Sequence, residues 1–366
     1  MITVRPATDA DQASWTRFVA GSPYGDFLHD WAWAAVAALD GQPQRRFVAE
    51  EEGELVALAA AQVRRLPLGR SFWYVPRGPV LDYDHARAGD RLRAMAIGLR
   101  ETARRDGALA VKLEPRLERG SPAVSHLRRL RHDARTLQVG QTRLVELADD
   151  EAMLASFDKD TRYAIRRAQR EGVTVGHTTD AADLLAVDAL HGLVLETQRR
   201  AGFPRPPLDR YRTAWRGLAG AGRAAIFQAR HDGRLLAAGM LVIEGDRSYY
   251  LFSGSIREAS GETKRYPSYA LQWAMLRHAR DAGVRVHDLW GIAPEDAGPE
   301  HPWYGVGLFK KGFQGRVVVW AGTWDVVVDP ALYRLRGLLG NGRAMARGAL
   351  GAAARAVRGR RPGRPG

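Results

Sequence analysis

The sequence predicts a mixed α/β fold built from two similar units in tandem. Its 366 residues favour two domains over one, and 45% hydrophobic with 26% charged residues is the composition of a soluble globular protein. A repeat relates the first half of the chain to the second. Both copies combine strand-like and helix-like patterns, which is typical of α/β units.

The repeat opens with a strand and continues with a hairpin. TVRPATDADQ at residues 3–12 returns as TVGHTTDAAD at residues 174–183. Further on, EEGELVALAAAQV around Gly53 returns as RHDGRLLAAGMLV around Gly233. An acidic turn with a glycine before an apolar strand indicates a hairpin in both copies.

The repeat closes with an aromatic strand, a helix and a final strand. FWYVPRGPV at residues 72–80 corresponds to YYLFSGSI at 249–256, and helices are predicted at 91–105 and 269–282. Each helix stops at a glycine, which suits a helix C-terminus, and leads into a strand, ALAVKLEP or VRVHDLW. The alternative is two unrelated stretches that share common turn residues. Four matches in the same order favour a true repeat.

The rest of the chain completes the predicted organisation. We expect the first unit at residues 1–148 and the second at 149–316. Residues 317–335 should complete the first unit, because the strand-like VVVWAGTWDVVV needs a sheet edge. Residues 337–366 are expected to form a flexible basic tail with seven arginines and no acid. The tail holds half of the net charge of +14, so the remaining chain is only mildly basic.

A basic helix is predicted between the two copies, at residues 156–172. Tyr163, Ile165 and Ala168 are expected on its inner side. Its arginines are Arg162, Arg166, Arg167 and Arg170. Taken alone, this pattern indicates a solvated helix face.

Several classes of chemistry are excluded. The chain has no cysteine, which rules out disulfides, thiolate nucleophiles and cysteine-ligated metals and fits a cytoplasmic protein. It has no GxxxxGK[ST] loop, no GxGxxG that opens a helix, no HExxH and no GxSxG. A signal peptide and an apolar run of about 18 residues are also missing. We therefore expect a soluble enzyme without a metal or redox cofactor.

The most unusual stretch is WYGVGLFKKGFQG, residues 303–315, which we expect to form a glycine-rich loop after a strand at 284–290. It contains Lys310 and Lys311, although the whole chain has only five lysines against fifty arginines. A lysine offers a compact ammonium group with an adjustable pKa. Aromatic, arginine and lysine side chains near strand ends suit a phosphorylated substrate and a developing oxyanion.

Five runs together resemble the FemABX peptidyltransferases, the aminoacyl-tRNA-dependent enzymes that build peptidoglycan cross-bridges. The runs are WYVPRGPVLD (73–82), KDTRYAIRRAQREGV (159–173), ETQRRAGFPR (196–205), YPSYALQW leading to HDLWGI (266–292), and GLFKKGFQG with the later Asp325, Pro330 and Tyr333. The resemblance covers roughly residues 1–335. It implies two GNAT-like domains, with the final strand returning to the first. No heptad-rich insertion is present, so the helical arm of some members is not expected.

The resemblance also implies catalytic residues. Phe309 and Lys310 match the family's Phe-Lys pair, and the Lys310 ammonium would stabilise the oxyanion formed when an amine attacks the aminoacyl ester. Lys311 is expected to face solvent or tRNA phosphate. Glu114 stands where members often have Asp before Pro, and it would help to orient the amine.

Substrate-binding residues follow in the same way. Arg200, and next to it Arg199, match the region that grips the diphosphate of the cell-wall precursor. The other candidates are Tyr250, Ser255, Arg77, Tyr163, Arg162 and Arg166. Tyr250 is equally well explained as a buried core tyrosine, and the helix residues as structural or tRNA-facing.

The resemblance implies a transfer of an amino acid from aminoacyl-tRNA to a stem-peptide amine, forming a cross-bridge or branch. The family's lysine for a soluble nucleotide precursor is replaced by Ala37 or Ala38, which favours a lipid-linked over a UDP-linked muropeptide. We expect a cytoplasmic monomer, with a weak contact between the basic tail and the inner membrane face.

Two alternatives stay open at this point. One is a GNAT-type acyl-CoA N-acyltransferase acting on a cell-envelope polysaccharide or natural product, although its pyrophosphate loop is missing. The other is a noncatalytic RNA- or membrane-binding protein, suggested by the basic tail.

Overall fold

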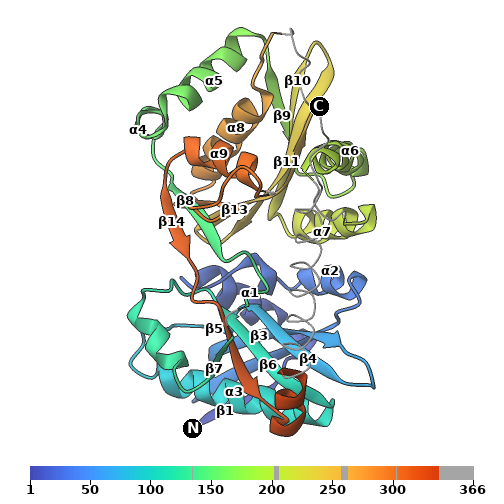
Figure 1. The fold of residues 1–366 in the computed structure, drawn as a ribbon, viewed down its shortest axis with the longest axis vertical. Coiled ribbons are helices and arrows are strands. Elements are labelled where there is room, and N and C mark those ends of the chain that lie inside the picture. Colours follow the sequence, from blue (N-terminus) through green and yellow to red (C-terminus); the bar gives the residue numbers. More distant parts are fainter. Residues whose placement is uncertain (134, 202–205, 257–262, 302, 338–366) are drawn as a thin grey trace, which may run out of the picture.

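The computed structural model contains two sheets, one above the other along the longest axis (Figure 1). It describes residues 1–133, 135–201, 206–256, 263–301 and 303–337, without the side chains of residues 200 and 201. The basic tail beyond residue 337 lies outside the described residues.

The first sheet has eight strands and contains the N-terminal copy of the repeat. In sheet order its strands are β1 (Ile2–Pro6), β2 (Gln44–Glu51), β3 (Glu54–Arg65), β4 (Ser71–Arg77), β6 (Ala108–Pro115), β15 (Thr323–Val327) and β7 (Arg131–Asp133), with β5 (Val80–Leu81) paired to β3. β4 and β6 run parallel, and the other neighbours run antiparallel. Helix α3 (Ala88–Arg105) provides the crossover between the parallel pair.

The second sheet repeats this order. Its strands are β9 (Thr174–Thr178), β10 (Ala224–His231), β11 (Arg234–Glu244), β12 (Arg247–Ser255), β13 (Val286–Gly291), β8 (Gln141–Glu146) and β14 (Arg316–Val319). Again one pair, β12 and β13, is parallel, with helix α8 (Pro267–Asp281) as its crossover. The predicted fold of two related α/β units is therefore confirmed.

Local residue choices explain why both copies fold alike. Gly53 and Gly233 adopt φ of +84° and +76° at the hairpin turns, a backbone region that a residue with a Cβ rarely enters. On α3 the predicted apolar side, including Leu92, Met95 and Leu99, is buried against the sheet. A continuous apolar stripe at helical spacing buries one face of the helix.

The sheets divide the chain differently from the sequence prediction at two strands. β8 precedes the predicted boundary at residue 148 but pairs with β13 in the second sheet. β14 lies within 317–335, which was assigned to the first unit, yet it pairs with β8. Only β15 joins the first sheet, beside β6. Each five-strand repeat is thus extended by two further strands, and neither extension is visible as a repeat in the sequence.

The remaining helices cover the sheets and their edges. They are α1 (Gln12–Gly21), α2 (Trp33–Leu39), α4 (Asp150–Ser156), α5 (Lys159–Arg170), α6 (Leu184–Ala201), α7 (Leu208–Gly220), α9 (Tyr304–Gly312) and the short 3-10 helices η1 (Asp9–Asp11), η2 (Phe27–His29) and η3 (Pro122–Leu127). Residues 330–337 are also helical. Among the described residues no helix is longer than the 18 residues of α3 and α6, and none is long and apolar enough to cross a membrane.

The two units share a core where η2 and α2 meet α7 and β12. Phe27 packs edge-on against Trp33 and Tyr249 and at a tilt against Trp290, with ring centroids 4.8 to 5.3 Å apart. Trp215 is fully buried in the same cluster. Because aromatic side chains bury large areas, this contact joins the two units firmly.

An ion-pair cluster lies beside that core. Arg223 binds Asp30 of the first unit at 2.7 Å and Glu244 of the second at 2.5 Å. Burial raises the pKa of Glu244 to about 7, although the Arg223 charge acts in the opposite direction. The interface therefore contains a carboxyl group that titrates near neutral pH.

Candidate active site

Lys310 lies on a helix rather than in the glycine-rich loop expected from the sequence. α9 spans most of the stretch, and its last residue, Gly312, packs against α5 so closely that a Cβ would lie 2.2 Å from Thr161 Oγ1. Phe309 and Lys310 leave α9 in different directions. The Phe309 ring packs 5.0 Å from Tyr269, whereas Lys310 is directed toward β13.

The Lys310 ammonium group is buried, with 6% of the residue exposed. Its Nζ donates a hydrogen bond of 2.7 Å to the carbonyl oxygen of Gly291, which uses one of its three donors. Burial lowers its pKa to about 8, and the nearby Asp288 carboxylate opposes that shift. Lys310 is therefore a cation poised to lose its proton just above neutral pH. Lys311, its neighbour, is exposed.

The HDLWG run of β13 fixes the carbonyl that Lys310 binds. Asp288 accepts hydrogen bonds from the Thr142 hydroxyl and, at 2.7 Å, from the Trp290 amide. Trp290 itself adopts a φ of +61°, an uncommon conformation for a bulky residue. These bonds turn the chain at the end of the strand and set the direction of the Gly291 carbonyl.

His287, beside Asp288, is a buried neutral group. Its two ring nitrogens lie 2.7 Å from Ser248 Oγ and 2.9 Å from Gln272 Nε2. Burial, reinforced by the Lys310 charge, lowers its pKa to about 3. HDLWGI is one of the runs that resemble the family, but none of its residues was among the predicted site residues. Two consecutive polar residues in an otherwise apolar strand were the available signal.

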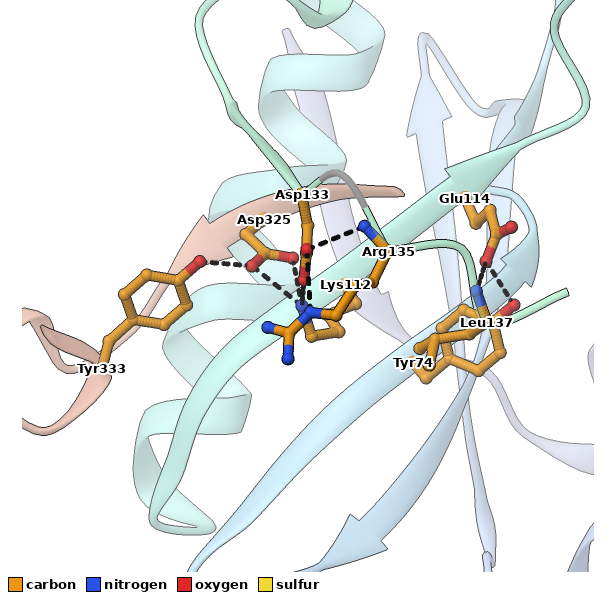
Figure 2. Close-up of polar contacts among 8 residues, drawn as sticks. All are labelled: Tyr74, Lys112, Glu114, Asp133, Arg135, Leu137, Asp325 and Tyr333. Carbon is orange, nitrogen blue, oxygen red and sulfur yellow. Dashed lines mark hydrogen bonds and ion pairs between the residues drawn. The ribbon is translucent and has the colours of Figure 1, made fainter. Parts of the chain in front are cut away.

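Glu114 is fully buried on β6 and is occupied by hydrogen bonds (Figure 2). Its carboxylate accepts the Tyr74 hydroxyl at 2.6 Å and the backbone amides of Leu137 and Gln138 at 3.2 to 3.3 Å. A carboxylate that accepts hydrogen bonds from three donors holds those donors in place. The geometry therefore favours an anchoring role for Glu114.

Two residues earlier on the same strand, Lys112 forms a second polar cluster (Figure 2). Its Nζ binds Asp133 at 2.8 Å and both carboxylate oxygens of Asp325 at 2.8 and 2.9 Å. Tyr333 donates its hydroxyl proton to Asp325, and Asp133 accepts the amide of Arg135 at 3.0 Å. This cluster ties β6, β15 and the chain after β7 together.

The segment from residue 137 to 139 lies between Glu114 and the Lys310 site. Glu114 holds its first two residues, and Arg77 Nη2 donates to the Val139 carbonyl at 2.8 Å. A Cβ on Gly291 would lie only 2.6 Å from Val139 Cγ1. Glu114 and Arg77 therefore hold this connecting segment, and the segment lies against Gly291, whose carbonyl Lys310 binds.

Buried charged side chains lie at the interface between the two units. Arg116, which was not among the predicted site residues, lies 3.7 Å from Asp26 and 4.0 Å from Asp288. Burial raises the pKa of Asp26, while the charges of Arg116 and Arg77 oppose that effect. Within the described part of the chain, five buried atoms here lack a hydrogen-bond partner. They are Asp26 Oδ2, Arg77 Nη1, Arg116 Nε, Tyr249 Oη and Trp320 Nε1.

Four further candidates come from β12 and α6. Tyr250 is a core residue that packs with Leu271 and Met275, and burial raises its pKa to about 12. The Ser255 backbone is bonded to the Thr197 hydroxyl at 3.0 Å. Arg199 is exposed near the end of α6. The side chain of Arg200 lies outside the described residues.

α5 carries the three remaining candidates and lies beside α9. Tyr163 is 47% exposed, so its predicted inward orientation is wrong, while Ile165 and Ala168 are buried. Arg162 donates to the carbonyl of Phe157, which caps the preceding turn. Arg166 is exposed. The helix therefore presents Tyr163 and Arg166 to solvent and uses Arg162 for local structure.

A metal site is not formed by the residues that the structure describes. No group of three or more His, Asp or Glu side chains in this part of the chain is placed to hold an ion. The Asp288 carboxylate near Lys310 instead accepts hydrogen bonds from the Thr142 hydroxyl and the Trp290 amide.

Two mixed sheets, each with one parallel crossover pair, form a repeated architecture of the GNAT-like kind. Residues 11–121 and 221–340, more than half of the chain, match the model of the FemAB family. The chain belongs to the FemAB family, which confirms the resemblance found in the sequence.

Known relatives agree with this assignment. The lipid II:glycine glycyltransferase of Staphylococcus aureus (strain MRSA252) is 24% identical, with 87% of this chain and 92% of the relative aligned. The crystal structure of FemX superposes with a TM-score of 0.81 at 22% identity, covering 91% of this chain and 99% of that one. A tandem GNAT protein from the clavulanic acid biosynthesis pathway superposes with a TM-score of 0.51 at 17% identity, covering 90% of this chain and 99% of that one. The two structures support the fold.

Proposed function

We propose that this protein transfers an amino acid from aminoacyl-tRNA to the stem-peptide amine of a lipid-linked peptidoglycan precursor. The observation that carries the proposal is Lys310, a buried ammonium group held at 2.7 Å by the Gly291 carbonyl beside a strained turn. Membership of the FemAB family and the relatives named for glycyl transfer to lipid II support the same class of reaction.

The reaction needs an oxyanion to be stabilised. The nitrogen of the acceptor amine attacks the ester carbonyl carbon, and a tetrahedral centre with a negative oxygen forms. The carbon–oxygen bond to the tRNA ribose then breaks, and the ribose hydroxyl leaves with the proton that the amine gives up. Two donors of the Lys310 ammonium are available to the oxyanion, and a buried charge acts strongly there.

The ester is already activated, so positioning and charge can supply most of the acceleration. In this proposal the tRNA acceptor end approaches α9 over α5, where Tyr163 and Arg166 are exposed. Phe309 of α9 packs against Tyr269 of α8 and would form the wall behind the aminoacyl group. Glu114 and Arg77 would hold the segment at 137–139 against Gly291.

The acceptor is proposed to be lipid-linked, as in the names of the relatives. The protein would then work on the cytoplasmic side of the membrane, where aminoacyl-tRNA is available. Arg199 and Arg200 stay our proposal for the diphosphate of the precursor, because arginine binds phosphate in a bidentate manner.

The proposal is tested with purified protein and a radiolabelled aminoacyl-tRNA. We expect the label to move to the lipid-linked muropeptide, and discharge of the tRNA to depend on that acceptor. Parallel reactions contain the UDP-linked muropeptide or no acceptor. Acetyl-CoA is titrated into the protein by calorimetry in a separate experiment. Absence of acceptor-dependent discharge across a panel of aminoacyl-tRNAs, together with tight acetyl-CoA binding, would replace the proposal by an acyl-CoA transferase.

A further inference from the structure

A groove of about 440 Å³ lies on the first unit, between α3, η3 and β15. Leu92, Ala96 and Val326 form a buried apolar floor, and Leu130 lies at the edge. The proposed transfer reaction uses none of these residues, and the groove lies on the sheet face covered by α3 rather than at the junction of the two units.

Three arginines form the rim of the groove. Arg93, Arg100 and Arg129 are all exposed. In the described part of the chain none of the three lies within ion-pair distance of a carboxylate. Other arginines of this region differ, because Arg87 and Arg91 are both paired with Glu51. Guanidinium groups left without partners are available to an external anion.

Acidic groups near the groove are few. Asp90 also lines it, but its carboxylate lies 3.8 Å from Arg87. Glu101 is exposed on α3 and does not line the groove. His126 and Ser125 complete the polar part of the lining. The rim therefore carries an excess of positive charge.

An exposed apolar side chain lies among these arginines. Ile97, on the turn of α3 between Arg93 and Arg100, is 50% exposed. Arginines that flank an exposed isoleucine form an amphipathic surface, which suits the boundary between lipid headgroups and acyl chains.

The groove lies at the end of the molecule where a second source of positive charge, the basic tail, begins. α3 lies at the end of the molecule opposite α5, and the helical residues 330–337 lie at that same end (Figure 1). The described chain stops there, and the sequence that follows carries seven arginines and no acid. The groove and the start of the basic tail therefore belong to one end of the protein.

We propose that this groove docks the protein on the surface of an anionic phospholipid bilayer. Arg93, Arg100 and Arg129 bind headgroup phosphates, and Ile97 enters the interfacial layer. RNA fits less well, because the lining contains no Trp, Tyr or Phe on which bases could stack. The groove also lies far from α5 and α9, where the donor is proposed to bind. The inference does not depend on the identity of the acyl donor or acceptor.

The test is cosedimentation of the full chain with vesicles of phosphatidylcholine, with and without phosphatidylglycerol. Each arginine at an anionic surface contributes about fivefold in partition coefficient. We expect the R93Q/R100Q/R129Q variant to bind the anionic vesicles at least about tenfold more weakly than the wild type. Binding of the wild type should also fall as salt is added.

The matched control removes the same charge elsewhere. Arg17, Arg216 and Arg234 are exposed arginines on other surfaces, and the R17Q/R216Q/R234Q variant should bind nearly as the wild type does. Unchanged circular dichroism spectra and melting temperatures verify that both variants fold. Equal losses in the two variants would show that only total charge matters, and would overturn the proposal.

A second pair of variants separates the groove from the tail. In a full chain whose seven tail arginines are replaced by glutamine, the groove should still support measurable binding that R93Q/R100Q/R129Q abolishes. No binding by the tail variant, or loss of tRNA binding without loss of vesicle binding in the groove variant, would contradict a lipid-docking groove.

Discussion

Lys310 shows how burial changes the chemistry of a residue that the sequence could only single out. Five lysines among fifty arginines drew attention to it, and the family resemblance suggested its role. Neither could reveal that its Nζ is bound to the Gly291 carbonyl or that burial lowers its pKa to about 8. Those properties come from the contact between α9 and β13, which are separated by a loop in the sequence.

The first prediction concerns pH. If the protonated form of Lys310 stabilises the oxyanion, the fraction of active protein falls as pH rises through about 8, because burial lowers the Lys310 pKa to that value. The acceptor alkylamine, with a pKa of about 10.4, gains reactive free base over the same range, so the two effects cancel above about pH 8. Single-turnover rates measured from about pH 6 to about pH 10 should therefore rise up to about pH 8 and then level off. A rate that keeps rising about tenfold per pH unit above about pH 8 would exclude Lys310 as the acting cation.

The second prediction concerns Gly291, whose carbonyl positions Lys310. In Gly291→Ala the new Cβ would lie 2.6 Å from Val139 Cγ1, so the strand end must shift. We expect turnover to fall about tenfold or more, since small misplacements of a catalytic group are costly. The control is Gly305→Ala on α9, where nothing lies within 4 Å. That variant should keep its rate and gain up to about 1 kcal/mol of stability. Equal rates in both variants would contradict the positioning role.

For other residues the sequence did not determine where the side chain lies in the fold. Tyr250 had two equally good interpretations, and the structure favours the core tyrosine because its ring packs under α8. Tyr163 was placed on the wrong side of its helix, because an aromatic side chain was assumed to be buried. Asp26, Arg116 and Asp288 could not be recognised, since their proximity depends on how the two units pack.

At the scale of elements, β6 is the most informative strand. It presents Lys112 and Glu114 to the same side, and both anchor the chain that leaves β7 for the second unit. Residue spacing of two in a strand places side chains on one face, so the pairing was predictable. Their partners at 133–138 follow no regular pattern, and only the structure identifies them.

The third prediction separates anchoring from base catalysis at Glu114. Glu114→Ala leaves the Tyr74 hydroxyl and two backbone amides without an acceptor, and should cost about 3 kcal/mol of unfolding free energy. Glu114→Gln keeps an acceptor oxygen, so turnover should stay within about tenfold of the wild type. The control is Glu118→Gln at an exposed pair with Arg316. A stable Glu114→Gln protein with turnover reduced about 100-fold or more would restore the role of base.

The repeat was the strongest prediction at this scale, because hairpin glycines and helix stops are local signals. The strands that extend each sheet, β8 and β14 in particular, were assigned to the wrong unit. A short apolar strand carries no information about which sheet edge it joins. That choice depends on how the chain crosses between the units.

At the scale of the whole molecule, the two units behave as one body because they share an aromatic core and buried charges. Phe27 of the first unit is enclosed by side chains of the second, and Arg223 binds carboxylates from both. The site at Lys310 borders this junction. Its geometry therefore depends on interface contacts that no single unit contains.

The fourth prediction concerns the pH dependence of stability. The pKa of Glu244 is raised from 4.5 to about 7, so the folded state keeps a proton that the unfolded chain has already released between those values. Stability is then largest below the lower value and is lost as pH rises through about 7. Glu244→Gln should remove this loss, amounting to about 2 kcal/mol between pH 5 and pH 8. Urea unfolding at both pH values measures this loss. The same change in unfolding free energy between the two pH values in wild type and variant would contradict the assignment.

The central claim is that the Lys310 ammonium drives aminoacyl transfer, and one comparison tests it most directly. Single-turnover transfer from aminoacyl-tRNA to the lipid-linked precursor is measured for Lys310→Met and for Lys311→Met, the same change at the exposed neighbour. We predict that Lys310→Met slows transfer about 100-fold or more while its melting temperature stays close to that of the wild type, and that Lys311→Met transfers normally. Transfer by Lys310→Met at the wild-type rate would contradict the account.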